Sequence, residues 1–183
     1  LPYHRNLDLA VFCIDHAIPY FDLGGSVEIS KDIHSYAQAN ATRPVLTDLG
    51  LAPGWANIIA EDMYQQWVLR EGEPPETITM MVGGLPQHPN NTLRYTCTWS
   101  YDGLVNEYRS DCIVLIDGKQ VAVRGLDGYQ FPVVSEIGVL EAFYTSGGAA
   151  HTIDTMRERG VQNCSYKTLR YPQHRRFVNF LIH

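Results

Sequence analysis

Apolar side chains recur at helical spacing near the start of the chain. In the stretch 6–18 the apolar positions are Leu7, Ala10, Val11, Ile14 and Ala17. Steps of three and four residues predict a helix. A short apolar run at 19–23, closed by Gly24 and Gly25, predicts a strand and a turn. A second helix after Ser26 and a second strand at 43–50 complete an alternation that is typical of a parallel α/β sheet.

The pattern changes character after a tight turn at 51–54. Pro53 is suited to begin the next helix, which we expect to run from Trp55 to about Arg70. Further helices are predicted at 102–108, 149–159 and after Pro172. The remaining apolar runs predict strands at 77–83, 93–99, 112–116, 120–123, 138–144 and 164–170, and a large aromatic such as Trp99 is expected to point inward. Asp117-Gly118 is a hairpin signal between two of these strands.

These elements divide the chain into three parts. Residues 1–54 predict the end of a parallel α/β sheet. Residues 55–170 predict an α+β domain with a mixed, largely antiparallel sheet. Residues 171–183 predict a C-terminal helix, which we expect to pack back on the first part.

Composition and charge narrow the function classes. The 183 residues are 45% hydrophobic and 19% charged, which is typical of a folded domain. A net charge of −6 argues against a nucleic-acid or anionic-membrane partner. The sequence has no run of 18 apolar residues. Four scattered cysteines without a C-x-x-C motif indicate free thiols and no metal site, and we expect a cytoplasmic protein.

Glycine-bearing loops at the predicted carboxyl ends of strands are the candidate ligand sites. In open α/β sheets ligands bind at these ends. The loop at 22–25 offers Asp22 as a polar contact to a ligand, although the spacing alone favours a simple turn capped by this aspartate. The loop at 48–54 enters a helix N-terminus that favours anionic groups or a simple cap. In the loop at 144–148, Thr145 and Ser146 fit either a substrate carboxylate or an N-cap.

Several familiar catalytic signatures are missing from the sequence. It contains no G-x-G-x-x-G, P-loop, H-E-x-x-H or G-x-S-x-G motif. The seven histidines show no metal-like pair. His4 and Asp22 are the candidate catalytic residues, His4 because it lies in the entry loop at the start of the chain.

Read in order, seven motifs resemble the saccharopine dehydrogenase family, and in particular its lysine 6-dehydrogenase-like branch. The motifs are FDLG (21–24), DLGLAPG (48–54), GGLP (83–86), Tyr95 with Trp99-Ser100, DGLVNEY (102–108), LEAFYTSG (140–147) and TLRYPQH (168–174). The resemblance implies an NAD- or NADP-dependent oxidoreductase that acts on a carbon bearing nitrogen. Saccharopine or lysine would yield 2-aminoadipate 6-semialdehyde, and the parallel strands would be the tail of a Rossmann-type sheet.

The resemblance also implies roles for individual residues. A small-molecule amino-acid substrate would contact Tyr3, Thr145, Ser146 and Gly147. Arg124 and Arg170 suit either a carboxylate clamp or a surface ion pair. The cofactor would be bordered by Leu1, Pro2, Asp22, Leu23, Gly24, Gly50, Pro53 and Gly54.

Two departures from the family qualify this interpretation. Related loops often carry an acidic residue after the hydroxyl positions, whereas this chain continues Gly147-Gly148. Leu1 resembles the middle of a family member, so the glycine-rich cofactor fingerprint and its βα units are expected ahead of it. The chain would then be a fragment without tight NAD(P) binding of its own, and self-association into a homodimer is expected from its exposed strand edge.

Two other interpretations stay open. One is a non-catalytic binding or scaffold domain derived from the same fold. The other, an enzyme of another kind, has little support, because no nucleophile–base pair or metal set is visible.

Overall fold

The computed structural model describes residues 3–134, 136–149 and 151–182. Contacts divide the chain into two compact units, residues 1–63 and residues 64–183. The division falls inside helix α3 (Trp55–Glu71), whereas the sequence pattern had suggested a boundary at residue 54. Among the described residues, no helix has both the length and the apolar character required to cross a bilayer.

The first unit contains a small parallel strand pair with two helices. Its elements are η1 (Tyr3–Arg5), α1 (Asn6–Asp15), β1 (Tyr20–Phe21), α2 (Val27–Asn40), β2 (Val45–Leu46) and the start of α3. Strand β1 pairs in parallel with β2, which confirms the predicted helix–strand alternation and parallel pairing, although each strand is only two residues long. Ala10, Tyr20 and Ile33 form its buried cluster. The Ser26 hydroxyl caps α2 by accepting from the Ile29 N–H at 3.5 Å.

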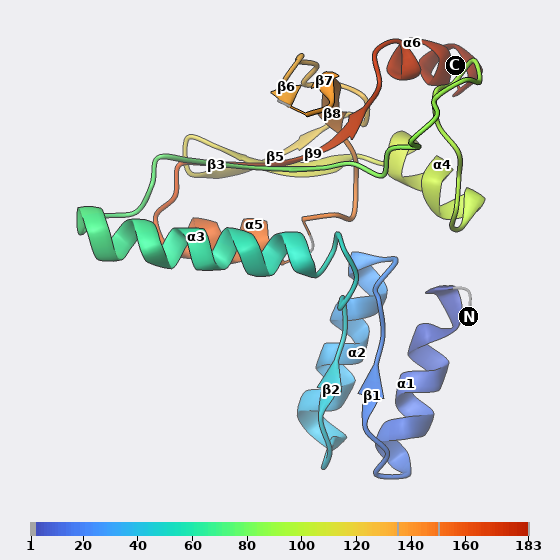
Figure 1. The fold of residues 1–183 in the computed structure, drawn as a ribbon. Helices are drawn as coiled ribbons and strands as arrows, with labels where there is room; N and C mark the ends of the chain where they lie inside the picture. Colours follow the sequence, from blue (N-terminus) through green and yellow to red (C-terminus); the bar gives the residue numbers. More distant parts are fainter. Residues whose placement is uncertain (1–2, 135, 150, 183) are drawn as a thin grey trace. The chain divides into compact units, whose positions relative to one another are not determined.

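The second unit is built on a five-stranded mixed sheet (Figure 1). The strands are β3 (Thr77–Val82), β4 (Cys112–Ile116), β5 (Lys119–Val123), β8 (Glu141–Tyr144) and β9 (Asn163–Arg170). Strand β9 pairs in parallel with β3 and antiparallel with both β4 and β8, and β4 forms the expected hairpin with β5. This confirms the predicted mixed, largely antiparallel sheet. Helices α4 (Tyr101–Arg109), α5 (Thr152–Glu158) and α6 (His174–Ile182) complete the unit.

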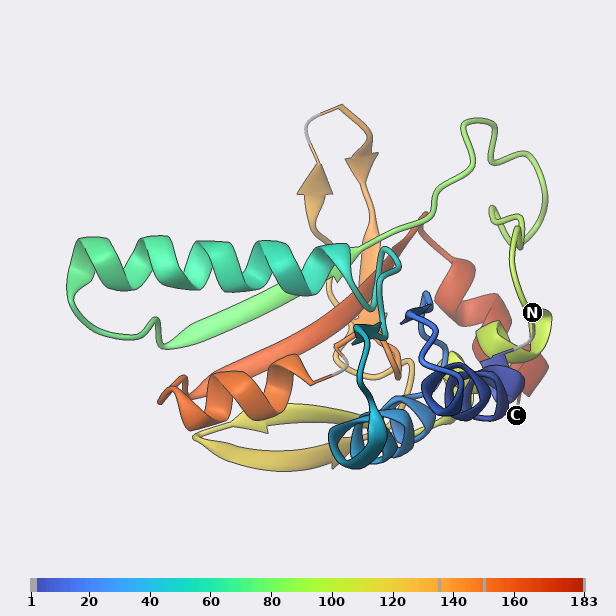
Figure 2. The same cartoon turned by 90° about the horizontal axis from the view of Figure 1, so that it is seen from below.

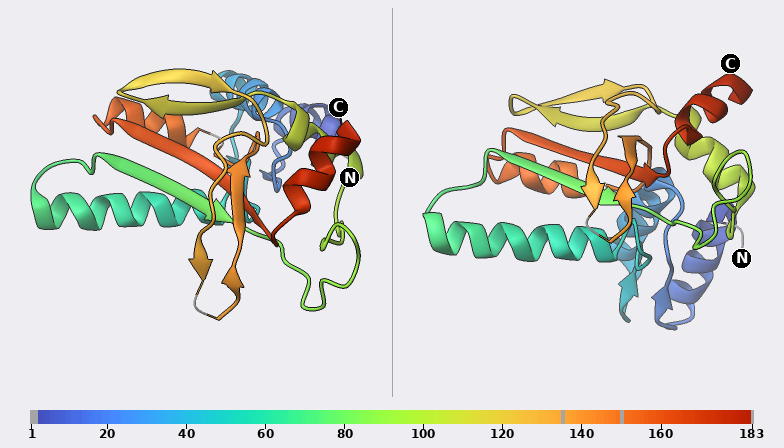
Figure 3. Two further views of the ribbon diagram at one scale, coloured as in Figure 1. Left: turned by 90° about the horizontal axis from the view of Figure 1, so that it is seen from above. Right: turned by 45° about the horizontal axis from the view of Figure 1, so that its top comes forward.

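A separate hairpin projects away from this sheet (Figure 2 and Figure 3). It pairs β6 (Val133–Val134) with β7 (Gly138–Val139). The sequence had predicted one strand at 138–144, but the structure divides that run between β7 and β8. The division falls at Leu140, which is buried and donates its N–H to the carbonyl of Pro132 at 2.9 Å.

The predicted strand at 93–99 is wrong, because this segment is an irregular loop. The Asn91 side chain accepts from the Tyr95 N–H at 3.1 Å and donates to the Tyr95 carbonyl at 2.9 Å. These two bonds occupy backbone groups that a strand partner would otherwise take. Trp99 was expected in the core but is 45% exposed, and its indole N–H donates to the Tyr95 hydroxyl at 3.1 Å.

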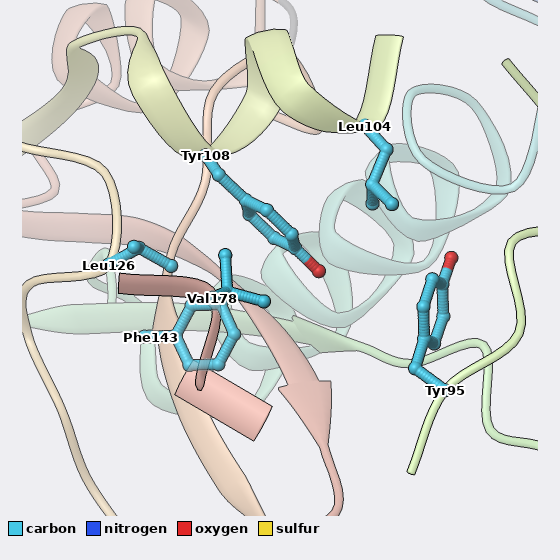
Figure 4. Close-up of a cluster of buried hydrophobic side chains, with 6 residues drawn as sticks. All are labelled: Tyr95, Leu104, Tyr108, Leu126, Phe143 and Val178. Carbon is cyan, nitrogen blue, oxygen red and sulfur yellow. The ribbon is translucent and has the colours of Figure 1, made fainter. Parts of the chain in front are cut away.

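The C-terminal helix packs within the second unit. Val178 of α6 belongs to a buried cluster drawn in Figure 4, which we call the aromatic core. Its members are Tyr95, Leu104, Tyr108, Leu126, Phe143 and Val178. Glu141 of β8 fixes the start of this helix: its fully buried carboxylate accepts from the N–H groups of Gln173 at 3.0 Å and Arg175 at 2.5 Å. The Tyr129 hydroxyl is a third donor to Glu141, at 2.8 Å, so this carboxylate is fully engaged in structure.

Candidate functional site

In the first unit, Asp22 holds together the turns that follow β1 and β2. Its Oδ1 accepts from the N–H groups of Gly24 at 2.7 Å and Asp48 at 3.1 Å, and its Oδ2 accepts from the Tyr20 hydroxyl at 2.9 Å. Burial raises the Tyr20 pKa, and the bond to Asp22 raises it further, so the phenol stays protonated and keeps donating. Asp22 therefore shapes the predicted cofactor rim through three bonds within the protein.

The glycines of this rim are required by its own packing. Gly24 has φ +84°, and a Cβ there would lie 2.5 Å from an Asp48 carboxylate oxygen. Gly54 has φ +130°, and a Cβ there would lie 2.2 Å from the Gly50 carbonyl oxygen. Gly50 itself packs against the carbonyls of Leu23 and Pro53. The glycines thus bring loops 22–25 and 48–54 together, while the Leu23 side chain stays 72% exposed.

The other predicted residues of this unit lie near its N-terminal turn. Leu1 and Pro2 lie outside the described residues. Tyr3 is half-buried in η1 against Gly25, where a Cβ on Gly25 would lie 2.4 Å from the Tyr3 Cβ. His4 is exposed in the same turn, next to the Tyr3 ring. The structure thus brings Tyr3 beside the 22–25 loop.

In the second unit, the loop after β8 carries the predicted substrate residues. The Thr145 hydroxyl is buried and shares a 2.7 Å hydrogen bond with the Thr168 hydroxyl of β9. The Ser146 N–H donates to the Glu107 carbonyl at 3.0 Å. Gly147 is exposed with φ +88°, and Gly148 lies against the Tyr166 ring, where a Cβ would come within 2.3 Å. The positive φ explains the glycine at 147, and the contact with the Tyr166 ring explains the glycine at 148.

Arg170, at the end of β9, is only 4% exposed. Its Nε donates to the Tyr108 hydroxyl at 3.2 Å, its Nη1 donates to the Leu169 carbonyl at 2.9 Å, and its guanidinium lies 4.3 Å from the centre of the Tyr95 ring. Among the described residues, no partner is found for Nη2. A buried, oriented guanidinium with a spare donor edge suits a carboxylate. Arg124, the other predicted clamp, is exposed.

Tyr108 links Arg170 to a buried histidine that the sequence analysis did not select. The His174 Nδ1 lies 2.8 Å from the Leu93 carbonyl, and its Nε2 lies 3.0 Å from the Tyr108 hydroxyl. Because a carbonyl can only accept, Nδ1 carries the proton and Nε2 accepts from Tyr108. Burial lowers the His174 pKa to about 4, so the ring is neutral at pH 7. The DGLVNEY and TLRYPQH motifs contain both residues, but their spacing did not show that they meet.

Glu107 is the second group that sequence reasoning missed. It precedes Tyr108 on α4, is half-buried, and interacts electrostatically with Arg170. Burial raises the Glu107 pKa to about 7, against the lowering influence of Arg170. A carboxyl and a guanidinium thus share one region with Thr145, Thr168 and Tyr108, and we call these five residues with His174 the polar cluster.

Comparison with known proteins identifies the family of the second unit. The family model for the saccharopine dehydrogenase C-terminal domain matches residues 50–183. Alpha-aminoadipic semialdehyde synthase of Rattus norvegicus, named as mitochondrial, is 28% identical over 127 residues, and the Mus musculus protein of the same name gives the same figures. The match covers 68% of this chain and 14% of each relative.

A solved structure shares the fold across the whole chain. Saccharopine dehydrogenase (L-Glu forming) from Saccharomyces cerevisiae, in its apo form, matches 100% of this chain and 41% of its own length. The TM-score is 0.72 at 19% sequence identity. The chain thus spans well under half of the length of these relatives. The family model covers most of the sequence, including the whole second unit, and the chain belongs to the saccharopine dehydrogenase family through its C-terminal domain.

Proposed function

We propose that this chain is the substrate-binding and dimerisation portion of an NAD(P)-dependent oxidoreductase that acts on the CH–NH group of an amino acid. The reaction would be of the saccharopine or lysine to 2-aminoadipate 6-semialdehyde type. Family membership supports the proposal, as do the printed names of the relatives, an aminoadipic semialdehyde synthase and a saccharopine dehydrogenase.

The observation that carries the proposal is the buried guanidinium of Arg170. Its Nε and Nη1 each donate one hydrogen bond to a group of the protein, and these two bonds fix the plane of the guanidinium. The remaining donors are therefore pre-oriented, and binding a carboxylate costs little additional ordering. The 145–147 loop lies beside it through the Thr145–Thr168 bond and the Ser146–Glu107 bond.

The cofactor part of the proposal rests on the first unit. A bound nicotinamide would accept the hydride from the substrate carbon. Gly24 and Gly50 each pack against the opposite loop, and Gly54 packs against the backbone of Gly50 and Asp48, so these glycines set the shape of the rim. Exposed Leu23 fits an apolar contact at the edge of a dinucleotide.

Steady-state oxidation of saccharopine and of lysine, followed as NADH or NADPH formation by the complete protein that contains this chain, tests the proposal. We expect Arg170→Met to raise KM for the amino acid at least about tenfold, because a charge-assisted bond to the carboxylate is lost. Arg124→Met is the matched control and should leave KM unchanged. Thermal unfolding of both variants separates loss of binding from loss of fold.

Two other outcomes would contradict the proposal in different ways. A KM effect of Arg124→Met without one of Arg170→Met would transfer the clamp to Arg124. No turnover by the wild-type protein with either nucleotide would favour the alternative of a non-catalytic binding or scaffold domain.

We further propose a homodimer. Exposed apolar side chains on and beside the β6–β7 hairpin support self-association, among them Phe131 at 55% and Val133 at 74% exposure. We keep the cytoplasm as the proposed location, although the names of the rodent relatives state that those proteins are mitochondrial.

A further inference from the structure

The carboxylate of Glu107 has an unusual position for a group without a partner. Among the described residues it makes no hydrogen bond and no ion pair, although it is half-buried on α4. Among the described residues, no side-chain nitrogen or oxygen that is closed off from solvent lacks a hydrogen-bond partner, so the Glu107 carboxylate stays in contact with solvent. A partly desolvated carboxylate that is open to solvent and has no partner in the protein is accessible to a cationic ligand group.

The backbone around Glu107 is tied to both parts of the proposed substrate site. Its carbonyl accepts from the Ser146 N–H at 3.0 Å, which joins the end of α4 to the 145–147 loop. The next residue, Tyr108, accepts from Arg170 Nε at 3.2 Å, which joins the same turn of α4 to the end of β9. The backbone of Glu107 is therefore fixed relative to both.

Glu107 and Arg170 attract each other without pairing. The charge of the Arg170 guanidinium lowers the Glu107 pKa, but the two side chains form no ion pair among the described residues. Arg170 also keeps its Nη2 edge without a partner there. A carboxylate on α4 and a guanidinium on β9, each without an ion-pair partner among the described residues, complement a ligand that carries an ammonium group next to a carboxylate.

We propose that Glu107 binds the α-ammonium group of the amino acid whose α-carboxylate is bound by Arg170, so that the pair recognises the zwitterionic head group. The inference deepens the proposed function and rests on it. It assigns to Glu107 the selection of amino acids over carboxylates that lack the amino group. Arg170 alone would bind both classes.

Calorimetric titration with L-2-aminoadipate and with adipate, which lacks the amino group, tests this assignment on the complete protein. We expect wild type to bind aminoadipate more tightly than adipate. Glu107→Gln should weaken aminoadipate binding about tenfold or more, because a charge-assisted interaction is lost, and should leave adipate binding unchanged or stronger. Glu158→Gln, at an exposed position of α5, is the control and should change neither affinity.

The outcomes separate this inference from the proposed function. If Arg170→Met weakens both ligands but Glu107→Gln weakens neither, or both equally, the ammonium assignment is wrong and the carboxylate clamp stands. If Arg170→Met weakens neither ligand, the clamp itself is wrong. Circular dichroism and thermal unfolding of Glu107→Gln confirm that the variant is folded, which the loss of an unpaired charge should not impair.

The pH dependence provides a second readout. The groups that interact with Glu107 are Arg170 and Tyr166 of β9, Tyr108 of α4 and Cys112 of β4. Burial raises the pKa of Tyr166 and of Cys112 to about 12 and also raises that of Tyr108, so all three stay neutral near pH 7. Glu107, with its pKa of about 7, is then the group that titrates. Aminoadipate binding should weaken below pH 7 in wild type, more than adipate binding does, and that difference should vanish in Glu107→Gln.

Discussion

The imidazole of His174 is held in one protonation state and one tautomer. Its surroundings contribute an acceptor at Nδ1, the Leu93 carbonyl, and a donor at Nε2, the Tyr108 hydroxyl. Tyr108 in turn accepts from Arg170, so donors and acceptors run in one direction from the guanidinium to the Leu93 carbonyl. If Nε2 were protonated, it would become a donor that faces the Tyr108 hydroxyl hydrogen. Tyr108 would then have to turn its own proton away and accept from both His174 and Arg170.

This arrangement predicts acid sensitivity. The folded His174 pKa of about 4 lies below its ordinary value of 6.5, mainly because of burial. The unfolded chain therefore binds more protons between pH 6.5 and pH 4, and the contribution of His174 to stability is full above pH 6.5 and is lost as the pH falls through this window. The loss amounts to about 3 kcal/mol at most.

Urea unfolding of wild type and His174→Gln, measured from pH 7.5 to pH 4.5, checks this expectation. The difference in unfolding free energy between the two should shrink as the pH falls. The contribution of Glu107 to the unfolding free energy changes in the opposite direction, because its raised pKa disfavours the folded state as the pH rises from 4.5 to 7. Glu107 is present in both proteins, so its contribution cancels in the difference between them. The exposed His88→Gln variant should keep the wild-type slope, and a constant difference for His174→Gln would contradict the assignment.

The loop between β8 and α5 shows how a whole element is positioned by one close contact. Gly148 brings the backbone against the Tyr166 ring, where any side chain would overlap the ring. We expect Gly148→Ala to destabilise the protein by about 1–3 kcal/mol, the usual cost of overpacking a filled site. Gly84→Ala is the matched control, because Gly84 has open space around its Cβ position and no positive φ.

Thermal unfolding with calorimetry measures both variants. A lower transition for Gly148→Ala, with Gly84→Ala close to wild type, is the expected result. Equal stability of the two variants would mean that the loop moves away from Tyr166 without cost, and the positioning of Thr145 and Ser146 would then need another cause.

Elements with a strong periodic pattern were predictable from sequence, and those defined by side-chain bonds were not. The mixed sheet and the parallel β1–β2 pair follow from alternation and spacing. The 93–99 loop has an apolar, aromatic composition typical of a strand, but the Asn91 side chain captures the Tyr95 backbone. Likewise, the sequence motifs selected Arg170 and Thr145 as candidates, whereas the contacts of Glu107 and His174 became visible only when folding brought α4, β9 and α6 together.

For the molecule as a whole, the proposed homodimer can be tested at the β6–β7 hairpin. Besides Phe131 and Val133, Ile137 and Val139 are about half exposed there. Light scattering coupled to size exclusion should show a dimer for wild type and a smaller species for Val133→Glu, because a buried charge without a partner opposes association.

Leu69→Glu provides the control for this experiment. Leu69 of α3 is 86% exposed and lies outside the hairpin, so its substitution should leave the dimer intact. A wild-type monomer would contradict the homodimer proposal. A dimer that persists in Val133→Glu but dissociates in Leu69→Glu would move the contact from the hairpin to α3.

Strand β9 encodes part of the polar cluster by alternation. Tyr166, Thr168 and Arg170 occupy every second position and share one face, while Lys167 and Leu169 point to the other. Insertion or deletion of a single residue before Tyr166 that shifted the pairing with β3 and β8 would exchange the two sets. A change in the length of β9 would therefore disrupt the proposed head-group site more than many single substitutions would. Natural length variation in this unit is expected instead in the β6–β7 hairpin and in the 84–100 loop.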